Sequence, residues 1–478
     1  MKLEQFFGLK KKGTDVKTEV MAGITTFFAL SYIVFVNPNQ IAADGASGWL
    51  VGLGADATVM GQIWNAVFIS SIIAAVIGTL LMGFYANLPF AQACGMGLNS
   101  YFCTCFVSGA FFAGVDVLQG YQAGVVIIFL SGILFLILSF TGAREYIAKA
   151  MPECLKKSIP AGIGLFIAMI GLKNAGIIQD NPYTFVQFVD INNGDWITQV
   201  APALVGMFGL ILIAVLTSLR VRGNIIIGIF TSTILYYVLT GAVPTFDLGH
   251  IQQSFADFGA VGVTALFTTE AWSNAFTGAN IGGVFSAIML ILTFCLVDMF
   301  DTIGTLYGTA AQANMLDQNG DPININQAMA CDSIGTVAGA VLGTSTCTTY
   351  VESAAGVAAG GRTGLTSVVT AICLAACLVL SPLASIIPSC ATAPALIFVG
   401  VLMLKNFSKV DMDNMQSAVP AFLALIMMPL TYSVANGIGI GSISYVLIAI
   451  GTGKFKQDDI VVAIISVLFI MKFMLITM

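Results

Sequence analysis

The sequence has few charged residues and almost no histidine. Charged side chains make up 9% of its 478 residues, whereas soluble domains carry about 25%. The single histidine, His250, and ten scattered cysteines with no CxxC pair provide neither a zinc site nor a disulfide framework. No basic run is interleaved with aromatic residues. We therefore expect no metal site and no nucleic acid partner, and these scarcities argue against a soluble domain.

Apolar residues dominate instead. They make up 58% of the chain, and the mean hydropathy is +0.94. A run of about 20 apolar residues crosses about 30 Å of hydrocarbon. We therefore predict an all-α polytopic protein of the cell (inner) membrane with 14 transmembrane segments in the lipid bilayer. The predicted segments are Val20–Val36, Gln62–Tyr85, Gly97–Ala113, Gln119–Thr141, Ile159–Leu172, Ala201–Leu219, Asn224–Gly241, Phe285–Tyr307, Gln327–Leu342, Glu352–Gly361, Leu365–Leu380, Ala391–Leu404, Val419–Val434 and Gly437–Gly451.

The basic residues are distributed unevenly across this arrangement. With the N-terminus in the cytoplasm, the inner segments hold all but Lys173 and Lys472 of the 18 Lys and Arg residues. The long outer loop, Ala242–Gly283, holds none. Cytoplasmic segments of membrane proteins carry such an excess of basic residues. We expect a cytoplasmic N-terminus, and an additional C-terminal segment, Ile460–Thr477, that is either a further span or an interfacial helix.

The predicted segments divide into two halves of seven, and halves with an odd number of spans insert with opposite orientations. Ile159–Asn174 and Thr392–Asn406 both end in Leu-Lys-Asn, and each is the fifth span of its half. Asn224–Gly241 also resembles Asn436–Gly453. These matches indicate a 7+7 inverted repeat.

Two segments at corresponding places interrupt the helical pattern. Leu88–Leu98 is rich in Pro and Gly, and Leu342–Tyr350 is rich in β-branched Thr, which favours extended backbone. We predict short strands in the broken third and tenth spans, each joined to a half-helix. Irregular backbone at membrane depth occurs only inside protein or beside a wet cavity, and paired broken spans indicate a transporter's binding site.

Two carboxylates lie in segments at membrane depth. Asp301 is inside the apolar run Phe285–Tyr307, and Glu352 is inside the Thr/Gly/Ala-rich stretch Thr344–Gly361. An acidic residue at the bilayer centre costs roughly 2.5–3.5 kcal/mol on insertion scales. A chain that keeps both is expected to use them for a polar substrate or an ion.

Each candidate also has a purely structural interpretation. Thr349 and Glu352 have the spacing of a capping box, in which Glu352 only closes a helix start. One carboxylate of the pair Asp298 and Asp301, a turn apart, could bond only to Thr or backbone groups. Asp332 lies near the start of its span, and Asn99 could be a plain helix cap.

These segments resemble the AzgA-like purine permeases of the nucleobase:cation symporter-2 superfamily, in order along nearly the whole chain. The resemblance rests on Ala22–Phe28 (AGITTFF), Val34–Pro38 (VFVNP), Gly95–Asn99 (GMGLN), Phe300–Gly308 (FDTIGTLYG), Asp332–Thr346 (DSIGTVAGAVLGTST) and Thr348–Gly364 (TTYVESAAGVAAGGRTG). It implies proton-coupled uptake of a purine nucleobase (adenine, guanine or hypoxanthine) with no resident cofactor beyond the coupling ion, H⁺. It also allows a homodimer.

The resemblance implies a core domain, residues 20–141 (spans 1–4) and 285–380 (spans 8–11), and a gate domain, residues 155–241 (spans 5–7) and 389–452 (spans 12–14). Residues 459–478 form the additional apolar segment. Glu352, Asn99 and Asp301 match the family's substrate-binding positions, with Thr349 and Ser353 beside them, and Asp301 also matches the coupling position. The surrounding residues are Asp298, Asp332, Gln92 and Thr25. Cys94 stands where the family usually has Pro, which bears on base preference.

The chemistry of the residues agrees with purine binding and proton coupling. A carboxylate accepts ring N–H groups of a purine, and Asn99 with half-helix N–H groups could serve the ring acceptors. With His250 in an outside loop, Asp301 is the expected proton carrier.

Other functions remain open. An anion carrier on the same fold, or a carrier of another small polar solute, is the alternative within transport, although two buried acids repel anions. An intramembrane enzyme would need a nucleophile with its base or a set of metal ligands, and none appears in the sequence. A channel or scaffold is less consistent with paired broken spans.

Overall fold

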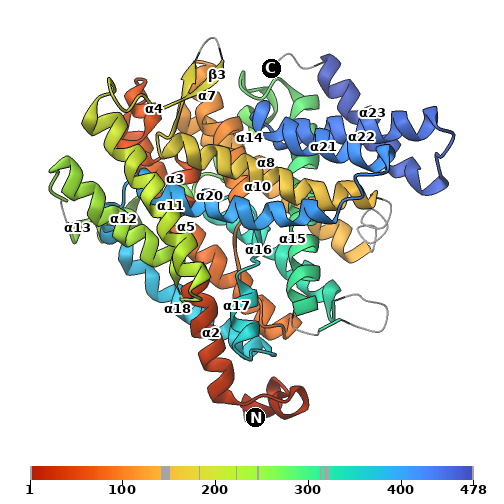
Figure 1. Ribbon diagram of the computed structural model, residues 1–478, viewed down its shortest axis with the longest axis horizontal. Coiled ribbons are helices and arrows are strands. Elements are labelled where there is room, and N and C mark those ends of the chain that lie inside the picture. Colours follow the sequence, from red (N-terminus) through yellow and green to blue (C-terminus); the bar gives the residue numbers. More distant parts are fainter. Residues whose placement is uncertain are drawn as a thin grey trace.

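The computed structural model describes residues 3–141, 151–181, 184–221, 223–244, 247–312, 315–316 and 322–475. Over these residues the chain is mostly helical (Figure 1). Nine of the described helices are long and apolar enough to cross a membrane, and three shorter apolar helices accompany them. The protein is therefore a multi-pass membrane protein.

The helices of the first half are α2 (Val16–Leu30), α3 (Ile33–Ile41), α5 (Ala57–Leu81), α6 (Met96–Phe102), α7 (Ser108–Phe112), α8 (Val117–Thr141), α10 (Glu153–Asn174), α11 (Ala201–Ser218) and α12 (Asn224–Thr240). Those of the second half are α15 (Val284–Gln312), α16 (Ile325–Leu342), α17 (Ser353–Ala358), α18 (Gly364–Ala376), α20 (Ser389–Leu404), α21 (Met415–Leu430), α22 (Val434–Gly451) and α23 (Ile460–Leu475).

The helices pack in two groups. In one, α16 lies against α5 and α8, α18 against α2 and α5, and α17 against α2. In the other, α10 lies against α20 and α21, α11 against α12 and α20, and α21 against α22. Figure 1 shows α10 and α20 side by side across the middle of the molecule. Helix α10 also touches α6 and α15, so it lies where the two groups meet.

Two short strands lie among these helices. Strand β1 (Gln92–Cys94) pairs antiparallel with β4 (Cys347–Thr349), and both strands are buried. They fall in the two segments where the sequence predicts extended backbone. Strands β2 (Ile178–Asn181) and β3 (Phe185–Phe188) form a separate hairpin outside the helical body. The β1–β4 pair thus joins segments from the two halves of the chain inside the protein.

The predicted outer loop Ala242–Gly283 is more ordered than a loop. It contains α13 (Gly249–Asp257) and α14 (Thr269–Thr277), and these helices pack on α5 and α8. Buried residues such as Val261 and Ala271 attach the segment to the core. The helices escaped prediction because each is too short for a span.

Candidate functional site

The β1–β4 pair forms the centre of the candidate site. Gln92 lies opposite Thr349, Ala93 opposite Thr348, and Cys94 opposite Cys347. The half-helix α6 follows β1, and α17 follows β4. Two bonds tie the strand pair to its surroundings, because the Ser353 hydroxyl accepts from Ala91 N at 2.9 Å and the Tyr350 hydroxyl donates to the Cys94 carbonyl.

Glu352 lies between β4 and α17 with its carboxylate incompletely paired. The Tyr32 hydroxyl donates to its Oε1 at 2.6 Å, and its Oε2 is buried with no hydrogen-bond partner among the described residues. Glu352 occupies the N-cap position of α17, but its side chain makes no capping bond. The capping-box interpretation with Thr349 is therefore wrong: the carboxylate reaches away from its own helix toward the first span.

Asp301 lies on α15, which packs against both β4 and α17. Its side chain is half-buried, and no described group hydrogen-bonds to its carboxylate. Asp301 and Glu352 are close enough for their negative charges to interact. The structure therefore brings the two carboxylates together from different helices, and both retain oxygen atoms that can accept a hydrogen bond.

Asp298 and Asp332 lie in a deeper cluster beside the strands, and both are fully buried. Gln92 Nε2 lies 3.2 Å from Asp332 Oδ1, and the Thr302 hydroxyl donates to Asp332 Oδ2. The Thr336 hydroxyl lies 2.9 Å from Asp298 Oδ2. Gln92 Nε2 also lies 3.4 Å from the Thr349 hydroxyl, which links the cluster to the strand pair.

Asn99 and Thr25 have their hydrogen bonds within the protein. Asn99 is buried on α6, where its Nδ2 donates to Asn37 Oδ1 at 2.8 Å and its Oδ1 accepts from the Ser345 hydroxyl. The Asn99 side chain therefore connects α3, α6 and the segment before β4. Thr25, on α2, donates to the Met21 carbonyl at 2.8 Å, one turn earlier on its own helix.

Sequence reasoning missed the partners that orient these groups. Tyr32, at the break between α2 and α3, is one apolar-looking residue in an apolar run, and nothing local shows that it meets Glu352, 320 residues away. Thr302 and Thr336 lie inside predicted spans next to acidic residues. Each lies one helical turn after an aspartate of its own helix but bonds to the aspartate of the other helix, so local spacing gave no signal of the true partners.

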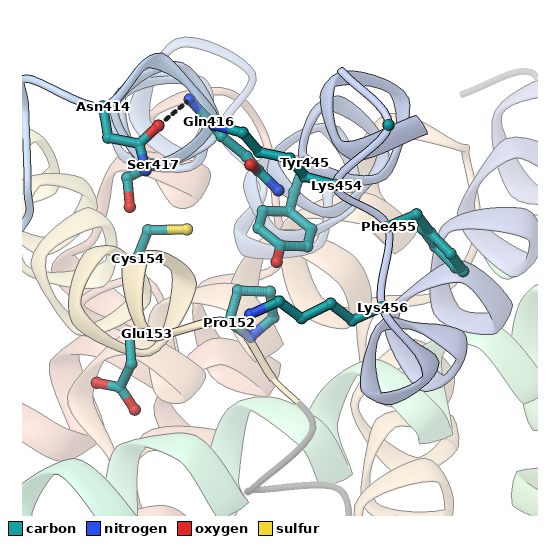
Figure 2. A pocket seen from close by; sticks show the side chains of 11 residues that line it. Pro152, Glu153, Cys154, Asn414, Gln416, Ser417, Tyr445, Lys454, Phe455 and Lys456 are labelled. Atoms are coloured by element: carbon teal, nitrogen blue, oxygen red, sulfur yellow. Dashed lines mark hydrogen bonds between the residues drawn. The ribbon is translucent and has the colours of Figure 1, made fainter. Parts of the chain in front are cut away.

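The described residues also form a pocket of about 590 Å³ that Asp301 and Glu352 do not line. Figure 2 shows it between the start of α10 and the end of α22, with the side chains of Tyr445 and Lys456 reaching toward it. The start of α21, at Gln416 and Ser417, closes another side. None of the predicted site residues lines it.

Comparison with known proteins places the chain in a family. The model of the "Permease family" matches residues 17–440. The guanine/hypoxanthine permease PbuG of Bacillus subtilis (strain 168) is 39% identical over 474 residues, covering 98% of this chain and 99% of the relative. The adenine permease AdeP of Escherichia coli (strain K12) is 35% identical, covering 98% and 95%. A putative permease, MJ0326, of Methanocaldococcus jannaschii is 36% identical, covering 98% of both chains.

Solved structures agree on the fold. The transmembrane domain of the cyanobacterial bicarbonate transporter BicA is similar with a TM-score of 0.56 at 15% identity, covering 88% of this chain and 97% of that one. SLC26A9 is similar with a TM-score of 0.57 at 12% identity, covering 92% and 66%. At such identities the likeness concerns the fold alone. Together with the sequence relatives it identifies the chain as a membrane transporter, not an enzyme, that belongs to the permease family of the nucleobase:cation symporter-2 superfamily.

Proposed function

We propose that the protein takes up purine nucleobases across the cell membrane by alternating access, driven by protons. The observation that carries the proposal is Glu352, between β4 and α17, whose Oε2 is buried without a partner among the described residues and whose charge interacts with that of Asp301. An acceptor in this position suits the ring N–H of a neutral purine. The names of the relatives PbuG and AdeP support this class of substrate.

Glu352 is the proposed anchor of the base. Tyr32 already occupies Oε1, so Oε2 is the oxygen that would accept the N–H of the purine. Charge-assisted hydrogen bonds of this kind are roughly twice as strong as neutral ones. Asn99, Thr349 and Ser353 are proposed contributors, and each would exchange a present bond within the protein for one to the substrate.

Asp301 is the proposed carrier of the coupling proton. No described residue donates a hydrogen bond to it, and its charge interacts with that of Glu352, so a proton bound there relieves the repulsion between the two charges. Proton binding at Asp301 would then permit capture of the base at Glu352. Both would be released after the site opens to the cytoplasm.

We further propose the 7+7 inverted repeat with 14 spans, a cytoplasmic N-terminus, and a core domain that moves against a gate domain. The two groups of packed helices support this division, because the first draws on residues 20–141 and 285–380 and the second on residues 155–241 and 389–452. Helix α10, which touches both groups, lies on the surface along which they would slide. A homodimer is compatible with this arrangement.

Transport of an anion is the competing function, because two proteins of similar fold, BicA and Slc26a9, are named a bicarbonate transporter and an anion transporter. The carboxylates Asp301 and Glu352 oppose it, since both present negative charge to the same space. A neutral substrate with N–H donors suits this electrostatic environment better than an anion.

The test is uptake by the purified protein in liposomes. Radiolabelled hypoxanthine, guanine and adenine should each be assayed with an inward proton gradient, with no gradient, and with competing xanthine, uracil or bicarbonate. We expect saturable uptake of at least one purine that the gradient concentrates and that bicarbonate does not inhibit. Uptake of bicarbonate in place of any purine would overturn the proposal.

A further inference from the structure

We propose that Asp298 holds a proton and Asp332 is ionised, in a buried site beside the β1–β4 pair that is separate from the coupling site at Asp301. The proposal concerns the substrate-free protein, and it holds whether or not the transported solute is a purine. It rests on burial, on the balance of charge and on the number of hydrogen-bond donors.

Burial and charge come first. Asp298 and Asp332 are both 0% exposed, and their charges interact. Among the described residues, no Lys, Arg or His side chain forms an ion pair or hydrogen bond with either carboxylate. Two buried carboxylates without a cation are very costly, because each ion lost its water on folding and each repels the other. A bound proton removes one of the two charges.

The hydrogen bonds show which carboxylate takes the proton. Asp332 has a donor for each oxygen, Gln92 Nε2 at 3.2 Å for Oδ1 and the Thr302 hydroxyl for Oδ2. Of the residues that the structure describes, Thr336 alone bonds to Asp298 Oδ2, and Asp298 Oδ1 is buried with none of them as a partner. The ionised form thus suits Asp332, and the protonated form suits Asp298.

Thr336 strengthens this assignment because a hydroxyl has a single hydrogen. Its Oγ1 lies 3.0 Å from Cys347 N, which donates to it, and 3.1 Å from Cys347 O. If the hydroxyl hydrogen goes to Cys347 O, Asp298 has no donor at all, and a protonated Asp298 can instead donate to Thr336. Strand β4 keeps both of its bonds to α16 in that arrangement.

Gln92 has a further unpaired acceptor in the same cluster. Its Oε1 is buried without a partner among the described residues, on the amide whose Nε2 bonds to Asp332. Gln92 is itself 0% exposed. A proton on Asp298 that donates to Thr336 does not reach this oxygen, so the Gln92 oxygen shows only that the cluster is short of donors.

The other titratable groups near Asp298 supply no positive charge. They are Asp301 on the same helix and the thiols Cys94, Cys295 and Cys347. No group of three or more His, Cys, Asp or Glu side chains that could hold a metal ion occurs among the described residues. These observations favour a proton over a metal ion.

Infrared spectroscopy tests the proposal on the purified, substrate-free protein at neutral pH. The Asp301→Asn/Glu352→Gln double variant removes both proposed site carboxylates and is the background. It should retain the C=O stretch of a buried, protonated carboxylic acid, and adding Asp298→Asn should remove that band. The asparagine amide supplies the missing donor, so this variant is expected to fold. Absence of the band from the background variant, or its persistence without Asp298, overturns the assignment.

A second measurement follows stability, through thermal melting of the wild type and of Asp298→Asn as pH rises above neutral. The native state holds a proton that the unfolded chain releases, so the unfolding constant of the wild type should rise about tenfold for each pH unit until the proton leaves. Asp298→Asn should lack this one-proton slope. Equal pH slopes of the unfolding constant in the two proteins contradict the proposal. Stabilisation of the wild type by Na⁺ that Asp298→Asn abolishes also contradicts it, because the site would then hold a metal cation.

Discussion

Glu19 and Glu352 lie in adjoining parts of the molecule but have opposite surroundings. Glu19, on α2, is fully buried and accepts from the backbone N–H groups of Arg362, Thr363 and Thr366 and from the Thr366 hydroxyl, which lies 2.6 Å away. It closes the start of α18 from another helix. Within the described part of the chain, Glu352 accepts from Tyr32 alone and has a bare, buried oxygen.

The difference separates a structural carboxylate from one available to a ligand. A buried acceptor without a donor costs about 1–3 kcal/mol, so the bare oxygen of Glu352 calls for an explanation, and a ligand bound during the working cycle supplies one. Both carboxylate oxygens of Glu19 already accept hydrogen bonds, and its role is to fix α18 against α2. The following predictions, from the largest effect to the smallest, test this separation.

The largest effect is expected at Asp301. Asp301→Asn should abolish accumulation of purine driven by a proton gradient, because the amide cannot bind and release a proton. Exchange of labelled for unlabelled purine across the membrane, which needs no net proton movement, should persist. Both are measured in liposomes, and full concentrative uptake by the variant would remove Asp301 from coupling.

Exchanging glutamate for glutamine at the two contrasted positions tests the comparison itself. Glu352→Gln should weaken purine binding roughly 10- to 150-fold, the loss of about 1.5–3 kcal/mol for a bond to a charged group, with little change in melting temperature. Glu19→Gln should leave affinity unchanged but lower stability by about 1–3 kcal/mol, because a carboxylate oxygen that accepts backbone N–H groups is replaced. Purine affinity and melting temperature should be measured for both variants. If Glu352→Gln and Glu19→Gln change affinity and stability to the same extent, the distinction between the two glutamates is wrong.

Tyr32 should have an intermediate effect. Tyr32→Phe removes the hydroxyl that holds Glu352 Oε1 and keeps the buried ring, so purine affinity should fall about tenfold with near-normal folding. The matched control is Tyr85→Phe. Tyr85 is 56% exposed, and among the described residues its hydroxyl forms no hydrogen bond with an acidic side chain. Unchanged affinity in Tyr32→Phe would mean that Glu352 needs no orientation by the first span.

The smallest effect is expected at Cys94. Backbone bonds from Gly95 N to Thr346 O and from Tyr350 N to Ala91 O place Cys94 and Cys347 between ladder bonds. Proline at position 94 therefore costs no ladder bond, and Cys94→Pro should change stability by no more than about 1 kcal/mol. We expect a modest shift in base selectivity or transport rate in a competition assay. If neither changes, Cys94 in place of the family's usual Pro has no effect on function.

Local signals in the sequence predict the multi-pass helical class and the segments that hold β1 and β4, but the described residues contain nine helices long and apolar enough to span, fewer than the 14 predicted. Apolar runs give the helices, and the Pro/Gly-rich and Thr-rich stretches give β1 and β4. Asp301 and Glu352 are conspicuous because carboxylates are rare in such segments. Contacts between distant segments leave no local signal, so Tyr32 was missed. Glu19 directly precedes the first predicted span, Val20–Val36, and no local pattern marks it, yet it is fully buried against α18.

The hydrogen-bond state of each side chain was equally inaccessible from the sequence. Asn99 has a polar side chain at a position where a ligand-binding residue is expected. Its bonds to Asn37 and Ser345, however, depend on how α3, α6 and the segment before β4 pack. The capping-box spacing of Thr349 and Glu352 was misleading for the same reason. The spacing permits the bond, and the packing of α2 and α3 beside α17 gives Glu352 another partner.

The account depends on a purine meeting the bare oxygen of Glu352, and the most direct measurement is an experimental structure of the protein with bound hypoxanthine or adenine. It should show a ring N–H within hydrogen-bonding distance of Glu352 Oε2, with Tyr32 still on Oε1 and Asp301 beside the base. A base bound instead in the pocket lined by Tyr445 and Lys456, with Oε2 of Glu352 still unpartnered, would contradict it.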